Sequence, residues 1–223
     1  MEKALTKVTP SQLGMLMECP RCAWLYFKRG LARPMGPFPS LPGGFDLLFK
    51  NYFDSFRSQD LLPPELAGKV EEKLFPGMEK LRIWRSNMQG IRAEFPEYNI
   101  LLKGAIDEML VANSGDLVVL DFKTRGYPVK EDSHTYYQTQ LDLYALLFDK
   151  NGYRVAPYGY LLFFWPSSYA QHGSKFETEL VKVATSPQGG RRALENLKEI
   201  LAREIPPSAS RCEFCRYRTF REE

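Results

Sequence analysis

The sequence predicts an α/β protein in which helices flank a central mixed β-sheet. Residues 117–122 (LVVLDF) and 158–165 (YGYLLFFW) are apolar runs of the kind that form strands buried on both faces. Amphipathic segments at residues 133–148 and 188–203 have the spacing of helices. No internal repeat or low-complexity segment interrupts this order, so a layered α/β core is the simplest architecture.

The first ninety residues are expected to be mainly helical. Ser11 is placed to cap a helix that leads into the first cysteines. Residues 33–44 are rich in proline and glycine and predict a loop, and residues 45–57 predict a second amphipathic helix. Residues 63–87 are also expected to be helical, with an interruption at Pro76 and Gly77.

From Ile91 the hydrophobic period changes to that of strands. Residues 91–112 predict two strands around a turn at 97–99, and Ser114 with Gly115 predicts the next turn. The elements expected after that turn are strands at 116–125, 157–165 and 175–183 and helices at 133–148 and 188–203. We therefore expect one domain over residues 1–223, with its core at about 91–185.

Length and composition exclude several classes of protein. With 223 residues, 44% hydrophobic and 26% charged, the chain can bury a sizeable core, so disorder is not expected. The net charge of +3 permits nucleic-acid binding without indicating it. No apolar run reaches the roughly 18 residues of a membrane span, and the first residues lack the apolar core of a secretory signal. We expect a cytoplasmic protein that has no membrane partner.

The four cysteines form two C-x-x-C pairs, Cys19 with Cys22 and Cys212 with Cys215. In a reducing compartment this spacing is typical of thiolate metal sites, because two thiolates around a tight turn can bind one metal. Two independent free or redox-active pairs are the alternative. If the pairs share one metal, the chain ends must meet, and residues 1–34 and 204–223 then form a subdomain stapled by the four-cysteine site.

A carboxylate and an ammonium end the most apolar strand. Asp121 and Lys123 are two residues apart, so strand alternation points both to one side. Asp107 lies on the neighbouring strand if residues 114–115 form a hairpin, and adjacent strands are about 4.8 Å apart. Two such carboxylates can hold a Mg²⁺ ion for phosphodiester hydrolysis, with the lysine orienting water and neutralising phosphate charge. An ordinary ion pair between Asp121 and Lys123 is the alternative.

Three motifs in this region carry a family resemblance: GAIDEML at 104–110, VVLDFKT at 118–124 and QLDLY at 140–144. Together they resemble the RecB-like branch of the PD-(D/E)XK nuclease superfamily, which includes the small CRISPR-associated exonucleases. The resemblance implies a restriction-endonuclease-like core that makes the chain a single nuclease domain. It implies that Asp107, Asp121 and Lys123 are catalytic, and that Gln140 and Tyr144, on one helix face, position phosphate or the core.

Two further acidic residues are candidate ligands of Mg²⁺ or Mn²⁺. Many relatives have a histidine ligand on an early helix, where this chain has Asp46. Asp46 is a third oxygen ligand, the N-cap of its helix, or both. Glu94 stands where the family often has a glutamate before the hairpin, and it is either a ligand or a surface residue.

The resemblance also bears on the cysteines. Several RecB-like nucleases hold an iron–sulfur cluster with one N-terminal and three C-terminal cysteines. Cys19, Cys212 and Cys215 match this arrangement, but the last cysteine is absent and Cys22 would supply the fourth thiolate. The resemblance thus implies a [4Fe-4S] cluster, whereas two facing C-x-x-C pairs are usual for Zn²⁺, and both remain open here. With all four thiolates used, either metal would be structural.

The function implied by the resemblance is a metal-dependent deoxyribonuclease, an exonuclease or a processor of DNA ends and single strands. Arg125 is the candidate phosphate contact, and Arg216 and Arg218 are candidates for a basic DNA-binding surface. For that surface, a solvated charged rim is the alternative. Unwinding would need a partner such as a helicase, since no phosphate-binding GKT or GKS loop is present.

Three other functions compete with this one. The first is a nuclease subunit of a CRISPR-adaptation complex, and the second is a catalytically weak DNA-binding or scaffolding subunit. The missing histidine favours the second, whereas the presence of Asp107, Asp121 and Lys123 disfavours it. A purely structural zinc protein is the third, and it leaves the three motifs unexplained.

Overall fold

The computed structural model describes residues 5–34, 40–171 and 173–222, without the side chains of residues 218–222. Its strands are β1 (Thr6–Val8), β2 (Lys73–Leu74), β3 (Ile91–Phe95), β4 (Ile100–Gly104), β5 (Glu108–Val111), β6 (Leu117–Thr124), β7 (Tyr158–Ala170) and β8 (Gly173–Ala184). Its α-helices are α1 (Pro10–Glu18), α2 (Pro20–Arg29), α3 (Ser40–Arg57), α4 (Met78–Arg85), α5 (Gln138–Lys150), α6 (Pro187–Ala202) and α7 (Glu213–Glu222). Short 3₁₀ helices, η1 (Pro96–Tyr98) and η2 (Ser133–Tyr137), precede β4 and α5.

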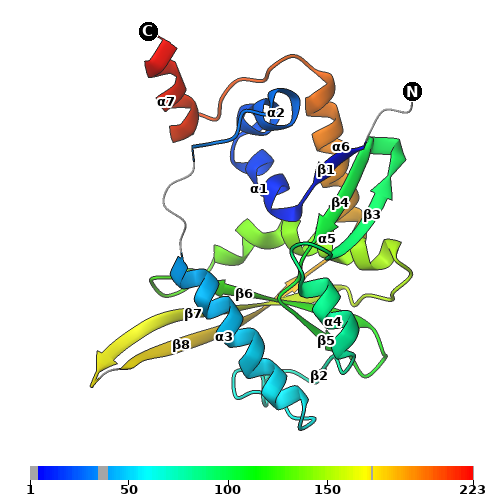
Figure 1. Ribbon diagram of the computed structural model, residues 1–223, viewed down its shortest axis with the longest axis vertical. Coiled ribbons are helices and arrows are strands. Elements are labelled where there is room, and N and C mark those ends of the chain that lie inside the picture. The colour runs from blue at the N-terminus through cyan, green and yellow to red at the C-terminus, as the bar shows by residue number, and fades with distance from the viewer. Residues whose placement is uncertain (1–4, 35–39, 172, 223) are drawn as a thin grey trace.

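The strands form two sheets, as the ribbon shows (Figure 1). The larger has the order β2-β5-β6-β7-β8, and in it β6 and β7 are parallel while the other pairs are antiparallel. The smaller has the order β1-β4-β3, with β1 parallel to β4. The predicted fold class, a mixed sheet flanked by helices, is therefore confirmed.

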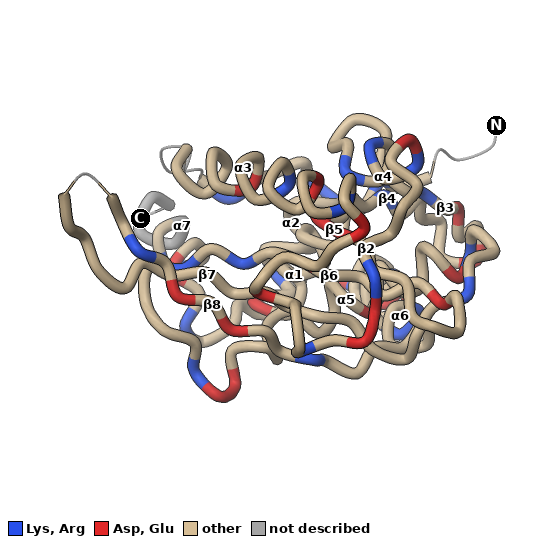
Figure 2. The backbone as a smooth tube through the Cα atoms, turned by 90° about the horizontal axis from the view of Figure 1, so that it is seen from below, with Lys and Arg blue, Asp and Glu red and all other residues tan. Residues whose placement is uncertain are grey.

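Helices cover both faces of the larger sheet, with α3 on one side and α5 and α6 on the other (Figure 2). Strand β6 shows why its sequence is so apolar. Val118, Leu120 and Phe122 pack in one cluster with Phe53 of α3, whereas Val119 packs in the other cluster with α5. Because side chains alternate along a strand, a strand covered on both faces needs apolar residues at nearly every position.

Two predictions for the N-terminal half were wrong. The cap of α1 is Thr9, which forms a capping box with Gln12, and Ser11 lies inside the helix. Residues 63–72 form turns, so the predicted helix is reduced to α4 at 78–85 after the short strand β2. Just after β2, the Arg57 side chain of α3 donates a hydrogen bond to the Phe75 carbonyl. This satisfies a backbone acceptor that would have bonded within a helix.

The prediction of two strands over residues 91–112 was also incomplete, because the chain forms three. β4 ends at Gly104 in the small sheet and β5 begins at Glu108 in the large one. Residues 105–107 cross between the sheets, and Asp107 lies at this crossing rather than inside a strand. The later elements agree with prediction, including the hairpin at Ser114 and Gly115, where Gly115 has a positive φ of 83°.

Two segments near the ends of the chain, the corner between α1 and α2 and the segment that carries α7, come together at the four cysteines (Figure 1). Helices α1 and α2 join at Cys19, and the segment after α6 returns to place α7 against α2. The Trp24 indole N–H donates to the Arg203 carbonyl at 3.1 Å and adds a second tie. Over the described part of the chain, none of the helices has the length and apolar character that crossing a membrane requires.

Candidate active site

The hairpin of β5 and β6 brings Asp107 level with Asp121. Glu108 pairs with Leu120, so the residue before Glu108 comes opposite the residue after Leu120. Asp107 is held there by the backbone, because its Oδ2 accepts a hydrogen bond from the Phe122 N–H at 2.9 Å. Asp121 is thus fixed by strand pairing, and Asp107, one residue before β5, is fixed by its hydrogen bond to the backbone of β6.

Asp121 is a buried carboxylate that pairs with the Lys123 ammonium. Its side chain is 2% exposed, and its Oδ2 lies against the Lys123 ammonium without accepting a well-aligned hydrogen bond from any described residue. Burial raises the pKa of Asp121 to about 7, the Lys123 charge opposes the rise, and the Asp107 charge adds to it. An additional cation at this point would stabilise the ionised form.

Gln140 and Tyr144 connect α5 to these groups. The Gln140 amide oxygen accepts from Lys123 Nζ at 2.9 Å, and its nitrogen donates to Asp121 Oδ1 at 3.4 Å and to the Tyr144 hydroxyl at 3.1 Å. The Tyr144 hydroxyl in turn donates to the Ala105 carbonyl at 2.7 Å, beside the crossing that carries Asp107. Gln140 and Tyr144 therefore position the carboxylates and the lysine.

Helix α3 adds two charges to the site. Asp46 lies well inside α3, which begins at Ser40, so the prediction that it caps its helix was wrong. Lys50, one turn later, places its ammonium 2.7 Å from Asp46 Oδ2 and 3.2 Å from Asp107 Oδ1. Sequence reasoning missed Lys50, although its i,i+4 spacing from Asp46 was a usable signal.

The Lys50 ammonium lies where carboxylates crowd together. Burial raises the pKa of Asp46, Lys50 opposes the rise, and the nearby Asp107 charge adds to it. Burial alone would lower the pKa of Lys50, but Asp107 and Asp46 raise it. The side chain stays charged, and α3 supplies a cation next to the carboxylates.

These residues line one cavity of about 320 Å³. Asp46, Asp107 and Asp121 offer oxygen atoms, and Lys123, Gln140 and Tyr144 complete its wall. Hard divalent cations such as Mg²⁺ and Mn²⁺ prefer carboxylate oxygens and keep several waters, for which this cavity has room. The buried Oδ2 of Asp121 pairs with Lys123 without a well-aligned hydrogen bond, so it is a suitable ligand for such a cation.

Two larger grooves adjoin the cavity. One, of about 670 Å³, runs along α1 and is lined by Ser11, Met17, Lys123, Tyr136 and Gln140 among others. The other, of about 560 Å³, is lined by Thr124, Arg125, Tyr127, Lys130 and both Tyr136 and Tyr137. Tyr136 and Tyr137 line both grooves and so connect them. Lys123 connects the first groove to the carboxylate cavity, and Thr124 connects the second.

The candidate phosphate contact Arg125 is fixed in the second groove. Its guanidinium donates to the Ser133 hydroxyl at 2.7 Å and lies 4.7 Å from the centre of the Tyr127 ring. Arg125 also donates its backbone N–H to the Phe164 carbonyl at 2.8 Å, so the base of the side chain is anchored to β7. The arginine is thus held two residues beyond Lys123, in the groove that adjoins the carboxylate cavity at Thr124.

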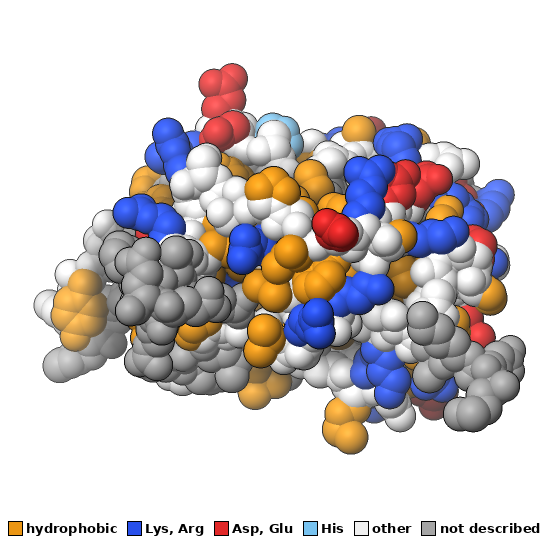
Figure 3. All heavy atoms as spheres, turned by 90° about the horizontal axis from the view of Figure 1, so that it is seen from above, with side chains coloured by type: hydrophobic (Ala, Val, Ile, Leu, Met, Phe, Trp, Pro, Cys, Tyr) orange, Lys and Arg blue, Asp and Glu red, His pale blue; other side chains and the backbone are white. Residues whose placement is uncertain are grey.

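Other predicted site residues lie elsewhere. Glu94 is exposed on β3, paired with Leu101, and does not line the carboxylate cavity. Arg216 is exposed on α7, and the side chain of Arg218 lies outside the described residues. Seen from above, lysines and arginines stand at several separate places among apolar side chains instead of forming one patch (Figure 3).

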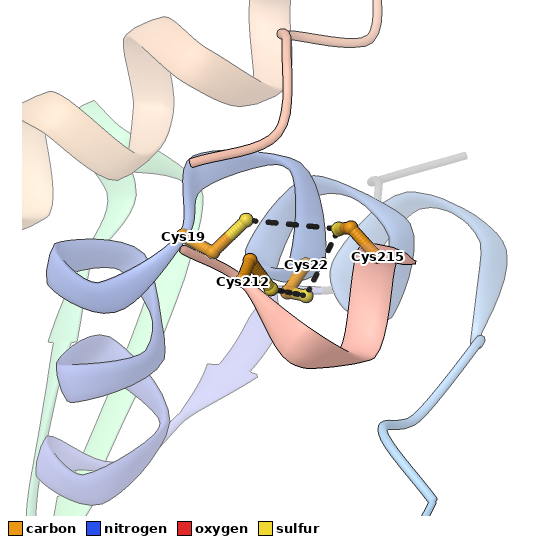
Figure 4. Close-up of side chains that lie close together, drawn as sticks. All are labelled: Cys19, Cys22, Cys212 and Cys215. Atoms are coloured by element: carbon orange, nitrogen blue, oxygen red, sulfur yellow. Dashed lines mark hydrogen bonds between the residues drawn. The ribbon is translucent and has the colours of Figure 1, made fainter. Parts of the chain in front are cut away.

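The four cysteines come together as a buried cluster in which their sulfur atoms all lie within 4.8 Å of one another (Figure 4). The closest pairs are Cys22 with Cys212 at 3.5 Å, Cys22 with Cys215 at 3.6 Å and Cys19 with Cys215 at 3.8 Å. None of these distances is that of a disulfide, so the four cysteines are not joined to one another by disulfide bonds. The prediction that the two pairs join the ends of the chain is confirmed.

The surroundings of the cluster lower the pKa of the Cys19 thiol and raise the pKa of the Cys22 and Cys215 thiols. Burial raises the pKa of the Cys19 thiol, but hydrogen bonds, first that from the Ala209 N–H at 3.4 Å, outweigh burial and lower the pKa to about 7. Burial raises the pKa of Cys22, and a hydrogen bond from Arg33 opposes this. Four sulfur ligands at these separations are able to bind one metal ion.

Comparisons with known proteins show one family match over most of the chain. A family model described as the PD-(D/E)XK nuclease superfamily matches residues 45–220. Among solved structures 14 chains match, and one, titled "Crystal structure of SSO0001", has 15% identity and a TM-score of 0.47 over 92% of this chain and 81% of that chain. No curated protein matches the sequence.

Proposed function

This chain belongs to the PD-(D/E)XK nuclease superfamily, and we propose that it is a deoxyribonuclease that requires Mg²⁺ or Mn²⁺. The observation that carries the proposal is the convergence of Asp107, Asp121 and Lys123 on one cavity. An ordinary ion pair between Asp121 and Lys123 would not require Asp107 to lie beside it. Nor would it require Gln140 to form hydrogen bonds with both Asp121 and Lys123.

Each residue has a defined task in this proposal. Asp107 and Asp121 hold the divalent cation, with Asp46 as a third oxygen donor from α3. When bound, such a cation polarises the phosphodiester and lowers the pKa of water. Lys123, held by Gln140 and placed 4.4 Å from the centre of the Tyr137 ring, faces the phosphate charge and orients the attacking water. Tyr144 fixes Gln140 and the chain beside Asp107.

The grooves support single-stranded DNA or a frayed end as the substrate. Tyr127 is 58% and Tyr136 79% exposed, and exposed aromatic rings bind bases by stacking, which a closed duplex does not permit. Arg125 and Lys130 supply positive charge for phosphates in the same groove. A strand lying along the tyrosines would pass Thr124 and reach Lys123.

The test is cleavage of end-labelled single-stranded and double-stranded DNA in the presence of Mn²⁺, Mg²⁺ or a chelator. We expect metal-dependent cleavage that favours single strands and is lost in Lys123→Ala and Asp121→Ala. Lys175→Ala is the matched control, because Lys175 is 70% exposed, pairs with Glu177 and does not line the cavity. Folded protein without activity on either substrate, or full activity of the Lys123→Ala variant, would refute the proposal.

A further inference from the structure

The spacing of the four sulfur atoms discriminates between the two metal centres that thiolates commonly form. Around a single Zn²⁺ the thiolates stand at the corners of a tetrahedron, about 2.3 Å from the ion. Tetrahedral geometry then places any two sulfurs about 3.8 Å apart. The three closest pairs here, at 3.5, 3.6 and 3.8 Å, and the limit of 4.8 Å for all pairs agree with this value.

A [4Fe-4S] cluster does not fit the same cage. Each cysteine of such a cluster binds a different iron, and the four irons are themselves separated at alternate corners of a cube. The sulfurs then stand outside the irons, so they are necessarily much farther apart than around one ion. Opening the cage would require Cys19 and Cys22, on the α1–α2 corner, to move away from the α7 segment.

Groups around the cage suit a compact tetrathiolate centre. Four thiolates around one Zn²⁺ carry two net negative charges, which neighbouring donors must stabilise. The Ala209 N–H donates to the Cys19 sulfur at 3.4 Å, and Arg33 lies beside Cys22 with its guanidinium 4.6 Å from the centre of the Phe214 ring. Arg33 is held in place by an ion pair with Glu18, the last residue of α1.

From these observations we propose that Cys19, Cys22, Cys212 and Cys215 bind a single Zn²⁺ ion and not the [4Fe-4S] cluster that the resemblance to RecB-like nucleases implies. The centre is structural, since four thiolates fill the tetrahedron. The position of the zinc ion also bears on the groove along α1. Cys19 directly follows α1, whose residues Ser11, Gly14 and Met17 form one wall of the groove that leads to Lys123. The ion therefore fixes the end of that wall.

The test is the metal content of the whole chain, produced in medium that contains both iron and zinc and purified without oxygen. We expect one zinc per chain, no acid-labile sulfide and none of the visible absorbance of iron–sulfur clusters. Reconstitution with Co²⁺ should give the ligand-field spectrum of a tetrahedral tetrathiolate. Four irons with four sulfides per chain, or a folded protein that holds neither metal, would overturn the proposal.

Matched variants separate this centre from the nuclease site. Cys22→Ser and Cys212→Ser should lose zinc and lower the melting temperature, whereas Asp107→Ala should retain one zinc per chain even if it abolishes cleavage. If the cysteine variants fail to fold, X-ray absorption of the wild-type protein still decides, because one ion surrounded by four sulfurs shows no metal–metal distance. Zinc content is independent of cleavage, so failure of the proposed nuclease activity would leave this result intact.

Discussion

The Lys50 ammonium lies 3.2 Å from Asp107 Oδ1. It also contacts Asp46 at 2.7 Å, so one positive charge bridges two carboxylates that are 61 residues apart (107 − 46 = 61). A divalent cation bound by Asp107 must compete with this ammonium or displace it. Helix α3 thus has a part in the site that the motifs on β6 and α5 do not show.

Lys50→Met should make the site easier to fill with metal. Removing the ammonium leaves Asp46 and Asp107 without their shared counter-charge, and we expect the Mn²⁺ concentration for half-maximal cleavage to fall about tenfold, equivalent to roughly 1.4 kcal/mol. Titration of Mn²⁺ in the cleavage assay measures this, with Lys175→Met as the control. A lower maximal rate with unchanged Mn²⁺ dependence would instead assign Lys50 to the phosphate.

Gly104→Ala should damage the site through packing alone. A Cβ at Gly104 would lie 2.8 Å from the Tyr144 ring and 3.0 Å from Leu147, both of which are buried. Overpacking of this kind costs about 1–3 kcal/mol in the free energy of unfolding, and moving the Tyr144 ring would disturb Gln140. The urea concentration at the unfolding midpoint and the cleavage rate should both be lower than those of Gly44→Ala. At Gly44 the added methyl meets nothing within 4 Å.

Glu108→Ala should be among the most destabilising single changes near the cavity. Glu108 is fully buried and pairs with Arg57 of α3 and with Arg85 of α4, the latter at 2.7 Å. Removing the carboxylate leaves two mostly buried guanidinium groups with Asp54 as their shared acidic partner, and losing one partner of a buried pair costs about 3–5 kcal/mol.

Equilibrium unfolding in urea tests this expectation for Glu108. Lys73→Ala is the control, because Lys73 pairs with Asp60 at 3.9 Å and both side chains are exposed. Its effect should stay below about 1 kcal/mol. Equal losses in the two variants would show that the buried network contributes no more than a surface pair.

Tyr136→Ala should weaken the binding of single-stranded DNA. A stacked base contributes roughly 1–3 kcal/mol, so affinity should fall about 5- to 150-fold, while Tyr136→Phe should keep most of it. Fluorescence anisotropy in the presence of a chelator measures binding without cleavage. Tyr169→Ala is the control, since Tyr169 is 75% exposed but lies on the β7–β8 ribbon. Equal weakening by both variants would contradict a stacking groove.

The sequence by itself determined the features that depend on neighbours along the chain. Strand alternation placed Asp121 and Lys123 on one face, and the turn at Gly115 brought Asp107 level with Asp121. Helical spacing placed Gln140 and Tyr144 together. These relations follow from periods of 2 and 3.6 residues and from one turn, so they hold wherever the segment forms its element.

Tertiary structure alone decided the rest. The contact of Lys50 with Asp107, the end of β4 before Asp107 and the exposure of Glu94 all depend on how α3 and the two sheets pack. The cysteine spacing predicted a shared metal site but did not discriminate between Zn²⁺ and a [4Fe-4S] cluster, because two C-x-x-C pairs can surround either. The distances between sulfurs are set by the packing of the two chain ends, and only packing brings residues that are nearly 200 positions apart within a few ångströms.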